Sequence, residues 1–421
     1  MVDFWSSDVL SAEVDLPKHQ LGWRMAVLPF RSVGAPVSFG IALGMAEEVS
    51  AALSRFRAPR MVATATFWDG SGPVADALAR CRTYQLDYII DGTIQVIEGD
   101  VLVHVTLLDV VLDFEVIWSQ RFDGPLKGLF ALQHRIASET VAQVDPELFY
   151  RASASEASAK TEVADAHQAV LTAIQGIFHP DRPDFMRAHD LLAKAIQLDP
   201  EYAAAHAWIA YWSIMAVGQG WVENPRDITT LAGTSAERAI VLDPLDARAL
   251  AIAGHVKGYL LHDVPSALHL HARAIELNPN LPIAWTLSSW SKIYNGEHDT
   301  AVRHAMMSRS LSPRDPHIFF VEHALMTAQF FKHNLEEAEM LAEAVFERNP
   351  RHASALNVRL AILGHMGRYD EARHCLSVLR AIDPNISVDK IVSRPPLRAE
   401  DKAFYIEGLE RAGVSCPLDK C

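Results

Sequence analysis

The amino-acid sequence predicts an α/β N-terminal domain with a mixed sheet, followed by an all-α solenoid of helical repeats. Three observations support this fold class: a proline-ended phrase that recurs through the C-terminal two-thirds, a two-helix pattern between successive copies, and a strand-rich N-terminal third. At 421 residues the chain exceeds the usual size of one domain, so at least two folding units are expected.

The N-terminal third alternates between strand-like and helix-like segments. Apolar runs typical of strands occur at residues 25–30, 60–66, 88–97, 101–111 and 115–122, and helical spacing of apolar residues occurs at 39–56, 74–85 and 126–148. The last three strand-like runs are separated by short segments that suit hairpins. An alternating start followed by a meander predicts the mixed sheet. We assign residues 1–22 to an N-terminal linker, 23–150 to the α/β domain and 151–163, rich in Ala and Ser, to a second linker.

A phrase of the form Ala-Ile-x-Leu-Asp/Asn-Pro recurs beyond residue 194, with looser copies towards the C-terminus. Its prolines are Pro200, Pro244, Pro279, Pro313, Pro350 and Pro384, separated by 44, 35, 34, 37 and 34 residues. A period near 34 residues is that of tetratricopeptide repeats. The spacing therefore predicts a repeat array over residues 164–390, with residues 391–421 as a C-terminal extension.

Each interval between prolines has the pattern of two amphipathic helices. Turn-forming breaks occur midway, at 295–296 and 367–368, and each proline is expected to end the second helix of its pair because it lacks an N–H. Small residues are expected where paired helices approach closely: Gly254, Ser289, Ala267, Ala301, Ala338 and Ala372. The interval from Pro200 to Pro244 is longer than the others, and we attribute the surplus to an inserted loop within 218–227.

Composition excludes several classes of protein. The net charge of -14 argues against direct binding to nucleic acid, which depends on clustered Lys and Arg. The most apolar segment, residues 101–118, contains four charged or His side chains, and residues 1–22 lack a basic start followed by an apolar run. We therefore expect no membrane span, no signal peptide and a cytoplasmic location.

The chemistry-bearing motifs of common enzymes are missing from the sequence. It has no Gly-rich loop ending in Lys-Ser/Thr and no Gly-x-Ser-x-Gly elbow. The nearest histidine clusters, His269 with His271 and His317 with His323, have spacings that do not suit two ligands on one helical face. We therefore expect no catalytic residue, no cofactor, no metal site and no enzyme activity.

The inner face of a repeat stack is the place where a protein or peptide partner would bind. Alignment of the repeats by their prolines places three residues at equivalent positions of the first helices and three more about one turn further on: Tyr211, His255 and Trp290, then Met215, Tyr259 and Tyr294. Aromatic residues in a groove often dominate the energy of partner binding. Aromatic residues at this spacing also pack between helices, and the sequence leaves both interpretations open.

Five segments carry a resemblance to a known architecture: MAVLPF at 25–30, GMAEEVSAALSRF at 44–56, LDYIIDGT at 86–93, IWSQRFD at 117–123 and LFALQ at 129–133. Together with the repeats, they resemble the C-terminal regulatory region of bacterial class III adenylate cyclases and winged-helix transcriptional regulators. In that region a domain like the N-terminal domain of TolB precedes tetratricopeptide repeats. The chain departs from this pattern because residues 1–22 leave no room for a catalytic cyclase domain or a winged helix.

The resemblance implies a non-catalytic regulatory or adaptor protein that binds a protein partner through its repeats. Its output would be cyclic-nucleotide or transcriptional control. Two alternatives remain: the detached sensor half of an adenylate cyclase, and a small-molecule sensor that acts through the α/β domain. The sequence does not identify the partner, the signal or the oligomeric state.

Overall fold

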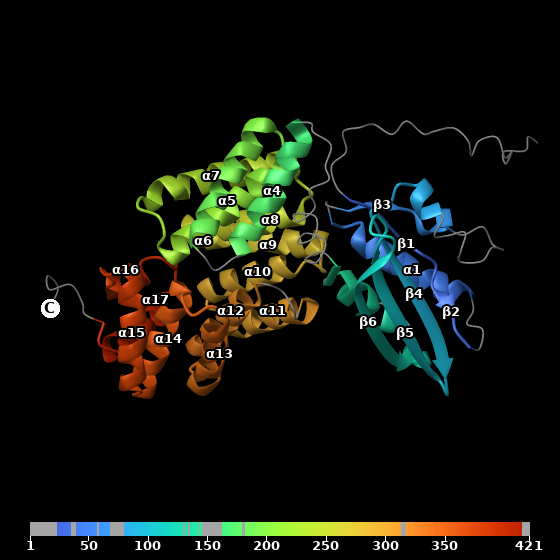
Figure 1. Ribbon diagram of the computed structural model, residues 1–421. Helices are drawn as coiled ribbons and strands as arrows, with labels where there is room; N and C mark the ends of the chain where they lie inside the picture. Colours follow the sequence, from blue (N-terminus) through green and yellow to red (C-terminus); the bar gives the residue numbers. More distant parts are fainter. Residues whose placement is uncertain are drawn as a thin grey trace, which may run out of the picture.

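The computed structural model describes residues 23–34, 39–56, 59–67, 80–128, 131–133, 135–141, 143–144, 162–178, 182–312 and 317–414. Within these ranges a mixed sheet with its helices is followed by a long stack of antiparallel helix pairs (Figure 1). The predicted fold class is confirmed. Side chains that face the same way recur about every two residues in the strands and about every four residues in the helices.

The sheet has a parallel half and an antiparallel half. Its strands are β1 (Arg24–Val27), β2 (Arg31–Ser32), β3 (Arg60–Val62), β4 (Tyr88–Ile97), β5 (Asp100–Asp109) and β6 (Glu115–Pro125). The order is β3-β1-β4-β5-β6, with β1 parallel to both neighbours and β2 paired in parallel with the far end of β4. The strands β4, β5 and β6 form antiparallel hairpins, as the short connections between them predict.

Alternation of buried and accessible side chains sets the two faces of the sheet. Val103 and Val105 of β5 are fully buried, and the residues between them point to the opposite face. Helix α1 (Phe39–Leu53) belongs to the same core, to which it contributes Met45 and Val49. Apolar residues recur every three to four positions in α1, so one stripe of the helix is buried against the sheet, in which every second side chain is buried.

Some N-terminal elements differ from the sequence-based expectation. The strand expected over 60–66 stops at Val62, because the chain turns into a 3₁₀ helix, η2 (Thr64–Phe67). The two-residue strand β2 was not predicted, since it is too short to show alternation. The closing helix begins as a 3₁₀ turn, η3 (Leu126–Gly128), before helical residues at 131–133, 135–141 and 143–144. Of the helix expected over 74–85, residues 80–83 are helical and 74–79 lie outside the described residues.

The C-terminal part consists of helix pairs in which each first helix is followed by an antiparallel second helix. The helices are α4 (Glu162–Phe178), α5 (Arg182–Leu198), α6 (Ala203–Gln219), α7 (Pro225–Leu242), α8 (Ala247–His255) with the π-helical turn η4 (Val256–Leu260), α9 (Val264–Leu277), α10 (Pro282–Tyr294), α11 (His298–Leu311), α12 (Ile318–Phe331), α13 (Leu335–Arg348), α14 (Ala353–Met366), α15 (Tyr369–Ile382), α16 (Val388–Val392) and α17 (Ala399–Arg411). Even-numbered helices from α4 to α14 are the first helices, and their partners are the second helices.

The recurring prolines mark the ends of the second helices, as predicted. Helix α7 ends at Leu242, two residues before Pro244, and α9 ends at Leu277, two residues before Pro279. The next helix, α8, begins shortly afterwards, because the carboxylate of Asp246 caps it by accepting hydrogen bonds from the backbone N–H groups of Arg248 and Ala249. Local sequence thus determines where these helices stop and start.

Small residues lie where paired helices come closest. A Cβ atom on Gly254 of α8 would lie 2.6 Å from the ring of His271 on α9. Ser289 of α10 donates a hydrogen bond of 2.9 Å to the carbonyl oxygen of Ala301 on α11. The predicted small positions Ala267, Ala301, Ala338 and Ala372 are all fully buried. Any larger side chain at these positions would push the paired helices apart.

The surplus residues between Pro200 and Pro244 do not form an inserted loop, so that prediction is wrong. Helices α6 and α7 have 17 and 18 residues, whereas the helices from α9 to α15 have 13 or 14. Only residues 220–224 separate α6 from α7. Gly220, with a positive φ of 69°, ends α6, and Asn224 with Pro225 begins α7 immediately afterwards.

The helix stack curls until its early and late first helices touch. Ser354 at the start of α14 donates a hydrogen bond of 2.8 Å to the carbonyl oxygen of Gly218 at the end of α6. The backbone N–H of Ala353 donates one of 2.9 Å to Oε1 of Gln219. We call this contact between α6 and α14 the closure contact. This contact partly closes the inner face of the stack and leaves a pocket with an open mouth.

The C-terminal segment folds back onto the stack. After α16, residues 393–398, which we call the strap, lead into α17. The Nη1 atom of Arg394 in the strap donates to the carbonyl oxygen of Gly218 at 3.4 Å, and His262 Nε2 donates to the carbonyl oxygen of Arg394 at 3.1 Å. Helix α17 lies against α14, where Gly364 and Gly408 face each other. Within the described ranges, no helix has the length and apolar character that a bilayer crossing requires.

The close contact of α17 with α14 gives a first prediction. A Cβ atom on Gly364 would lie 2.0 Å from the carbonyl oxygen of Gly408, so Gly364→Ala should lower the free energy of unfolding by about 1–3 kcal/mol or more in urea titrations. The control is Gly233→Ala in α7, where the new atom would meet only Leu261 Cδ1 at 3.8 Å. That change should be neutral or stabilise by up to about 1 kcal/mol. Equal effects of the two substitutions would contradict the tight contact.

Candidate functional site

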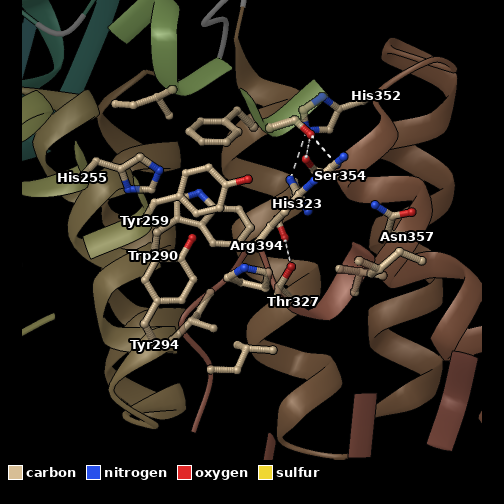
Figure 2. A pocket seen from close by; sticks show the side chains of 18 of the residues that line it. His255, Tyr259, Trp290, Tyr294, His323, Thr327, His352, Ser354, Asn357 and Arg394 are labelled. Atoms are coloured by element: carbon tan, nitrogen blue, oxygen red, sulfur yellow. Dashed lines mark hydrogen bonds between the residues drawn. The ribbon is translucent and has the colours of Figure 1, made fainter. Parts of the chain in front are cut away.

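The inner face of the helix stack contains a partly open pocket with a cavity volume of about 80 Å³, or about 740 Å³ when the open space of its mouth is counted. Its walls come from α6, α8 with η4, α10, α12 and α14, and the strap with α17 lies along its margin (Figure 2). The lining residues are Ile214, Met215, Gly218, Gln219, His255, Tyr259, Trp290, Ile293, Tyr294, Phe320, His323, Thr327, Phe331, His352, Ser354, Asn357, Val358, Ile391, Arg394, Pro395, Leu397 and Tyr405. The cavity proper is small, so it holds one side chain or a small ring, and the rest of a bound group would lie in the mouth.

A chain of hydrogen bonds ties the pocket wall to the closure contact. Gln219 Oε1 accepts from a backbone N–H of α14, so the Nε2 amide of Gln219 is the donor to His352 Nδ1. His352 Nε2 is then left to donate to His323 Nδ1 at 3.1 Å. This chain needs neutral imidazoles, because a proton on His352 Nδ1 would face the amide N–H of Gln219.

Burial keeps these histidines uncharged. Desolvation, aided by neighbouring imidazoles, lowers the pKa of His255 and of His317 to about 3, and desolvation alone lowers the pKa of His352 to about 3. It lowers the pKa of His323 well below its usual value, with a smaller contribution from His352. At neutral pH the imidazoles therefore act as polar but neutral parts of the wall.

Aromatic rings form one side of the pocket. The rings of Tyr259 and Tyr294 are nearly parallel, at 17°, with centroids 6.3 Å apart, and the imidazole of His255 stacks on Tyr259 at 5.6 Å. Trp290 stacks on Phe320 of α12 at 5.6 Å. The π-helical turn η4 carries Tyr259, and such turns recur at functional sites.

Polar side chains form the opposite side. Figure 2 shows Thr327, Ser354 and Asn357 across the pocket from Tyr259 and Trp290, with Arg394 between the two sides. As far as the structure describes it, the lining contains no Asp, Glu or Lys, so Arg394 supplies its one full charge. In the described ranges, no group of three or more His, Cys, Asp and Glu side chains could hold a metal ion.

Three polar atoms of the lining are buried without a hydrogen-bond partner among the described residues. They are His255 Nδ1, Trp290 Nε1 and Asn357 Oδ1, on side chains that are 2%, 6% and 5% exposed. A buried polar group left unpaired costs about 1–3 kcal/mol. Such groups are uncommon in folded proteins, and a bound molecule that offers partners would remove the cost.

The structure brings together five of the six residues that the sequence singled out. Met215, His255, Tyr259, Trp290 and Tyr294 all line the pocket. They are also packed between helices, since Trp290 is only 6% exposed, so packing accounts for these positions and partner binding stays a prediction.

Tyr211, the sixth residue, does not line the pocket. It is 1% exposed, and its hydroxyl hydrogen bonds to His317 Nδ1 at 3.1 Å. It therefore belongs to the packing between helices, whereas a role in partner binding stays a prediction for the other five.

Sequence analysis did not single out the polar side of the pocket. The proline alignment, extended to Pro313, ends beside His323, and that signal could have identified this residue. No comparable signal exists for Gln219, His352 and Arg394. They lie at helix ends and in the strap, and they meet only because the stack closes.

Comparisons with known proteins give a curated relative and several solved structures. No family model matches the chain. It is 25% identical over 220 residues to a protein of Rhizobium meliloti that carries the name "Putative adenylate cyclase 3", and the alignment covers 52% of this chain. The chain spans only 37% of the length of that curated relative.

Solved structures similar to the chain include two tetratricopeptide-repeat proteins and an assembly that contains Cut9. A thermophilic repeat protein of Thermus thermophilus is 17% identical and covers 45% of this chain and 98% of its own, with a TM-score of 0.36. YrrB, described as having an unusual peptide-binding site, is 19% identical and covers 47% and 90%, with a TM-score of 0.29. The Cut9–Hcn1 hetero-tetramer is 15% identical and covers 68% and 49%, with a TM-score of 0.42.

The neutral histidines give a prediction about pH. In the unfolded chain a histidine takes up a proton near pH 6.5, whereas the folded pKa of His352 is about 3, so its contribution to stability is complete above pH 6.5 and is lost progressively as pH falls towards 3. Each such histidine contributes a slope of up to ~1.4 kcal/mol per pH unit below about pH 6.5. Urea unfolding at pH 8 and pH 5.5 should show this loss.

The variant His352→Gln isolates one of these contributions. It retains a hydrogen-bonding side chain but removes the titrating group, so its stability should fall less steeply between pH 8 and pH 5.5 than that of the parent chain. The comparison at pH 8 serves as the control for any general destabilisation. Identical slopes in the two proteins would show that His352 does not stay neutral in the folded state.

Proposed function

We propose that this chain is a non-catalytic regulatory or adaptor protein that binds a partner protein through its tetratricopeptide repeats, in cytoplasmic signalling or transcriptional control. The observation that carries the proposal is the pocket on the inner face of the stack. It combines aromatic side chains with buried polar atoms that lack partners. Residues 164–390 supply most of this site and the C-terminal extension adds Arg394 and its neighbours, whereas residues 23–150, which resemble the N-terminal domain of TolB, sense or pass on the signal.

Aromatic anchors support partner binding at this site. Trp290, Tyr259 and Tyr294 lie on one side of the pocket, where a buried contact with a partner excludes water. Trp and Tyr are the residue types that most often dominate binding energy in such places. The long chain of contacts from the pocket through His323 and His352 to α6 holds these anchors in a fixed arrangement.

The closure contact and the strap limit the form of the bound segment. With α6 joined to α14, an extended peptide cannot lie along an open groove. The partner therefore enters with one side chain or one chain end, and the remainder of it contacts the rim. This is narrower than the groove-filling peptide that repeat alignment alone indicates.

The pocket chemistry supports a non-catalytic role. The described lining has no carboxylate to hold a metal ion or to move a proton, and its histidines are kept neutral by burial. General acid–base catalysis at neutral pH needs groups that titrate near that pH.

A double substitution tests the anchor role. Trp290→Ala with Tyr259→Ala should weaken the partner, isolated with the parent chain and then purified, by at least about 30-fold, corresponding to ~2 kcal/mol. The control Tyr369→Ala removes an aromatic residue that is 52% exposed on α15, outside the pocket, and should leave affinity unchanged. Affinity is measured by calorimetry, after circular dichroism shows that both variants are folded.

A photo-crosslinking side chain at position 357 provides a second measure of the same site. It should attach to the purified partner, and the same group at position 369 should not. A partner that binds the double variant as tightly as the parent chain, or that crosslinks equally from both positions, would exclude the pocket as its site.

A second candidate function is that of the sensor half of an adenylate cyclase. The similarity to the Rhizobium meliloti protein named "Putative adenylate cyclase 3" favours it, because this chain spans 37% of that protein. In this case the catalytic part would lie on a separate chain, and the repeat stack would be its regulator.

Reconstitution tests the second candidate. The part of the Rhizobium meliloti protein outside the aligned 220 residues is purified and supplied with ATP and Mg²⁺. Addition of this chain should change the rate of cyclic AMP formation at least twofold, and addition of the Trp290→Ala, Tyr259→Ala variant should change it less. Equal rates with and without the chain count against a sensor role.

A further inference from the structure

The two sides of the pocket demand different chemistry from a bound group. Figure 2 shows aromatic rings of η4 and α10 on one side and the polar side chains of α12 and α14 on the other. A ligand that fits both must present an apolar surface to Tyr259 and Trp290, and a polar group towards Arg394 and Asn357. Size limits the enclosed part of the ligand to about one small ring, since the cavity proper is about 80 Å³ and the remaining space is open mouth.

The shape of the aromatic side favours a flat group. The planes of Tyr259 and Tyr294 differ by only 17°, and the imidazole plane of His255 differs from that of Tyr259 by 20°. A planar ring on the ligand can pack against such rings in the offset-stacked or edge-to-face arrangements that aromatic groups favour, which a branched aliphatic group cannot do.

The charge of the pocket favours an anion. Arg394 has no acidic side chain within ion-pair distance in the described part of the chain, and the hydrogen bond from its Nη1 to Gly218 is long, at 3.4 Å. By contrast Arg398, four residues later in the same strap, pairs with Glu400 at 2.6 Å. The guanidinium of Arg394 thus lies beside a lining without carboxylates, where a planar carboxylate is its best complement.

The unpartnered atoms favour the same kind of ligand. Trp290 Nε1 can only donate, so it needs an acceptor oxygen or nitrogen. A carboxylate has two oxygens and can accept from the indole and the guanidinium. Asn357 Oδ1, also without a partner, calls for a donor such as a ring or amide N–H on the ligand.

We infer that the pocket binds a planar aromatic group that carries a carboxylate and an N–H donor. This inference rests on the proposed function, since it names the chemistry of the anchor that the same pocket takes. Two sources have this chemistry: a free aromatic acid, and an aromatic residue at the C-terminus of a partner chain. In both cases Arg394 binds the carboxylate and the rings of η4 and α10 stack on the aromatic group.

Calorimetry with the purified full chain and a matched set of compounds tests the inference. Indole-3-acetate carries the ring, the N–H and the carboxylate, indole lacks the charge, tryptamine reverses it, and octanoate lacks the ring. Indole-3-acetate should bind at least 10-fold more tightly than each of the other three. A short peptide ending in a free C-terminal tryptophan, compared with its amidated form, separates the two sources: tighter binding of the free-ended peptide than of indole-3-acetate indicates a partner's chain end, and the reverse indicates a free acid.

Two strap variants assign the charge preference. Arg394→Gln should weaken indole-3-acetate at least 10-fold and leave indole unchanged, whereas Arg398→Gln, at a paired and exposed arginine, should alter neither. Trp290→Phe keeps a ring but removes the N–H donor, and it should also weaken indole-3-acetate. Circular dichroism checks that each variant is folded.

The inference is overturned if indole and indole-3-acetate bind equally, if none of the compounds binds, or if Arg394→Gln has no more effect than Arg398→Gln. None of these results would contradict the proposed function, which is tested separately by the affinity of a protein partner for the Trp290, Tyr259 double variant. Conversely, a protein partner that binds the Trp290, Tyr259 double variant as tightly as the parent chain would count against the proposed function, whereas the ligand site is judged by indole-3-acetate and Arg394→Gln.

Discussion

The closure contact between α6 and α14 is the constraint on which the rest of the helical part depends. Without it, the first helices would line an open groove, and the strap would have no pocket to cover. The contact is made by polar groups, Gln219, Ser354 and a backbone N–H, and not by apolar packing alone. Hydrogen bonds in a buried place have strict geometry, so they determine how far the stack curls as well as holding it there.

The same contact explains why His352 and His323 are buried. His352 receives a hydrogen bond from α6 and donates one to His323 of α12, so a neutral imidazole links three helices that are distant in sequence. A carboxylate could not donate, and an ammonium group could not accept. An uncharged imidazole can donate one hydrogen bond and accept another. The described lining of the pocket therefore has no full charge other than that of Arg394 in the strap.

The sequence predicts well whatever depends on neighbours along the chain. Helix ends depend on local signals such as Pro244, Pro279 and the capping residue Asp246, each of which affects the backbone within about one helical turn. Likewise, β4 pairs with the strand that follows it in the sequence. The inserted loop expected near residue 220 failed because helix length is set by tertiary packing as well as by local signals. Neither His352 nor Arg394 could be assigned to the pocket from sequence, since their partners on α6 lie 133 and 176 residues away.

Closing the stack also changes how its repeat units depend on one another. An ordinary solenoid is a row of units, each touching only its neighbours, so units can be gained or lost at little cost and its ends fray first. Here the bonds from Ser354 and Ala353 to α6 join a helix near the start of the row to one near its end. The number of units between α6 and α14 is thereby fixed, because one unit more or fewer would leave Gln219 facing the wrong turn of helix.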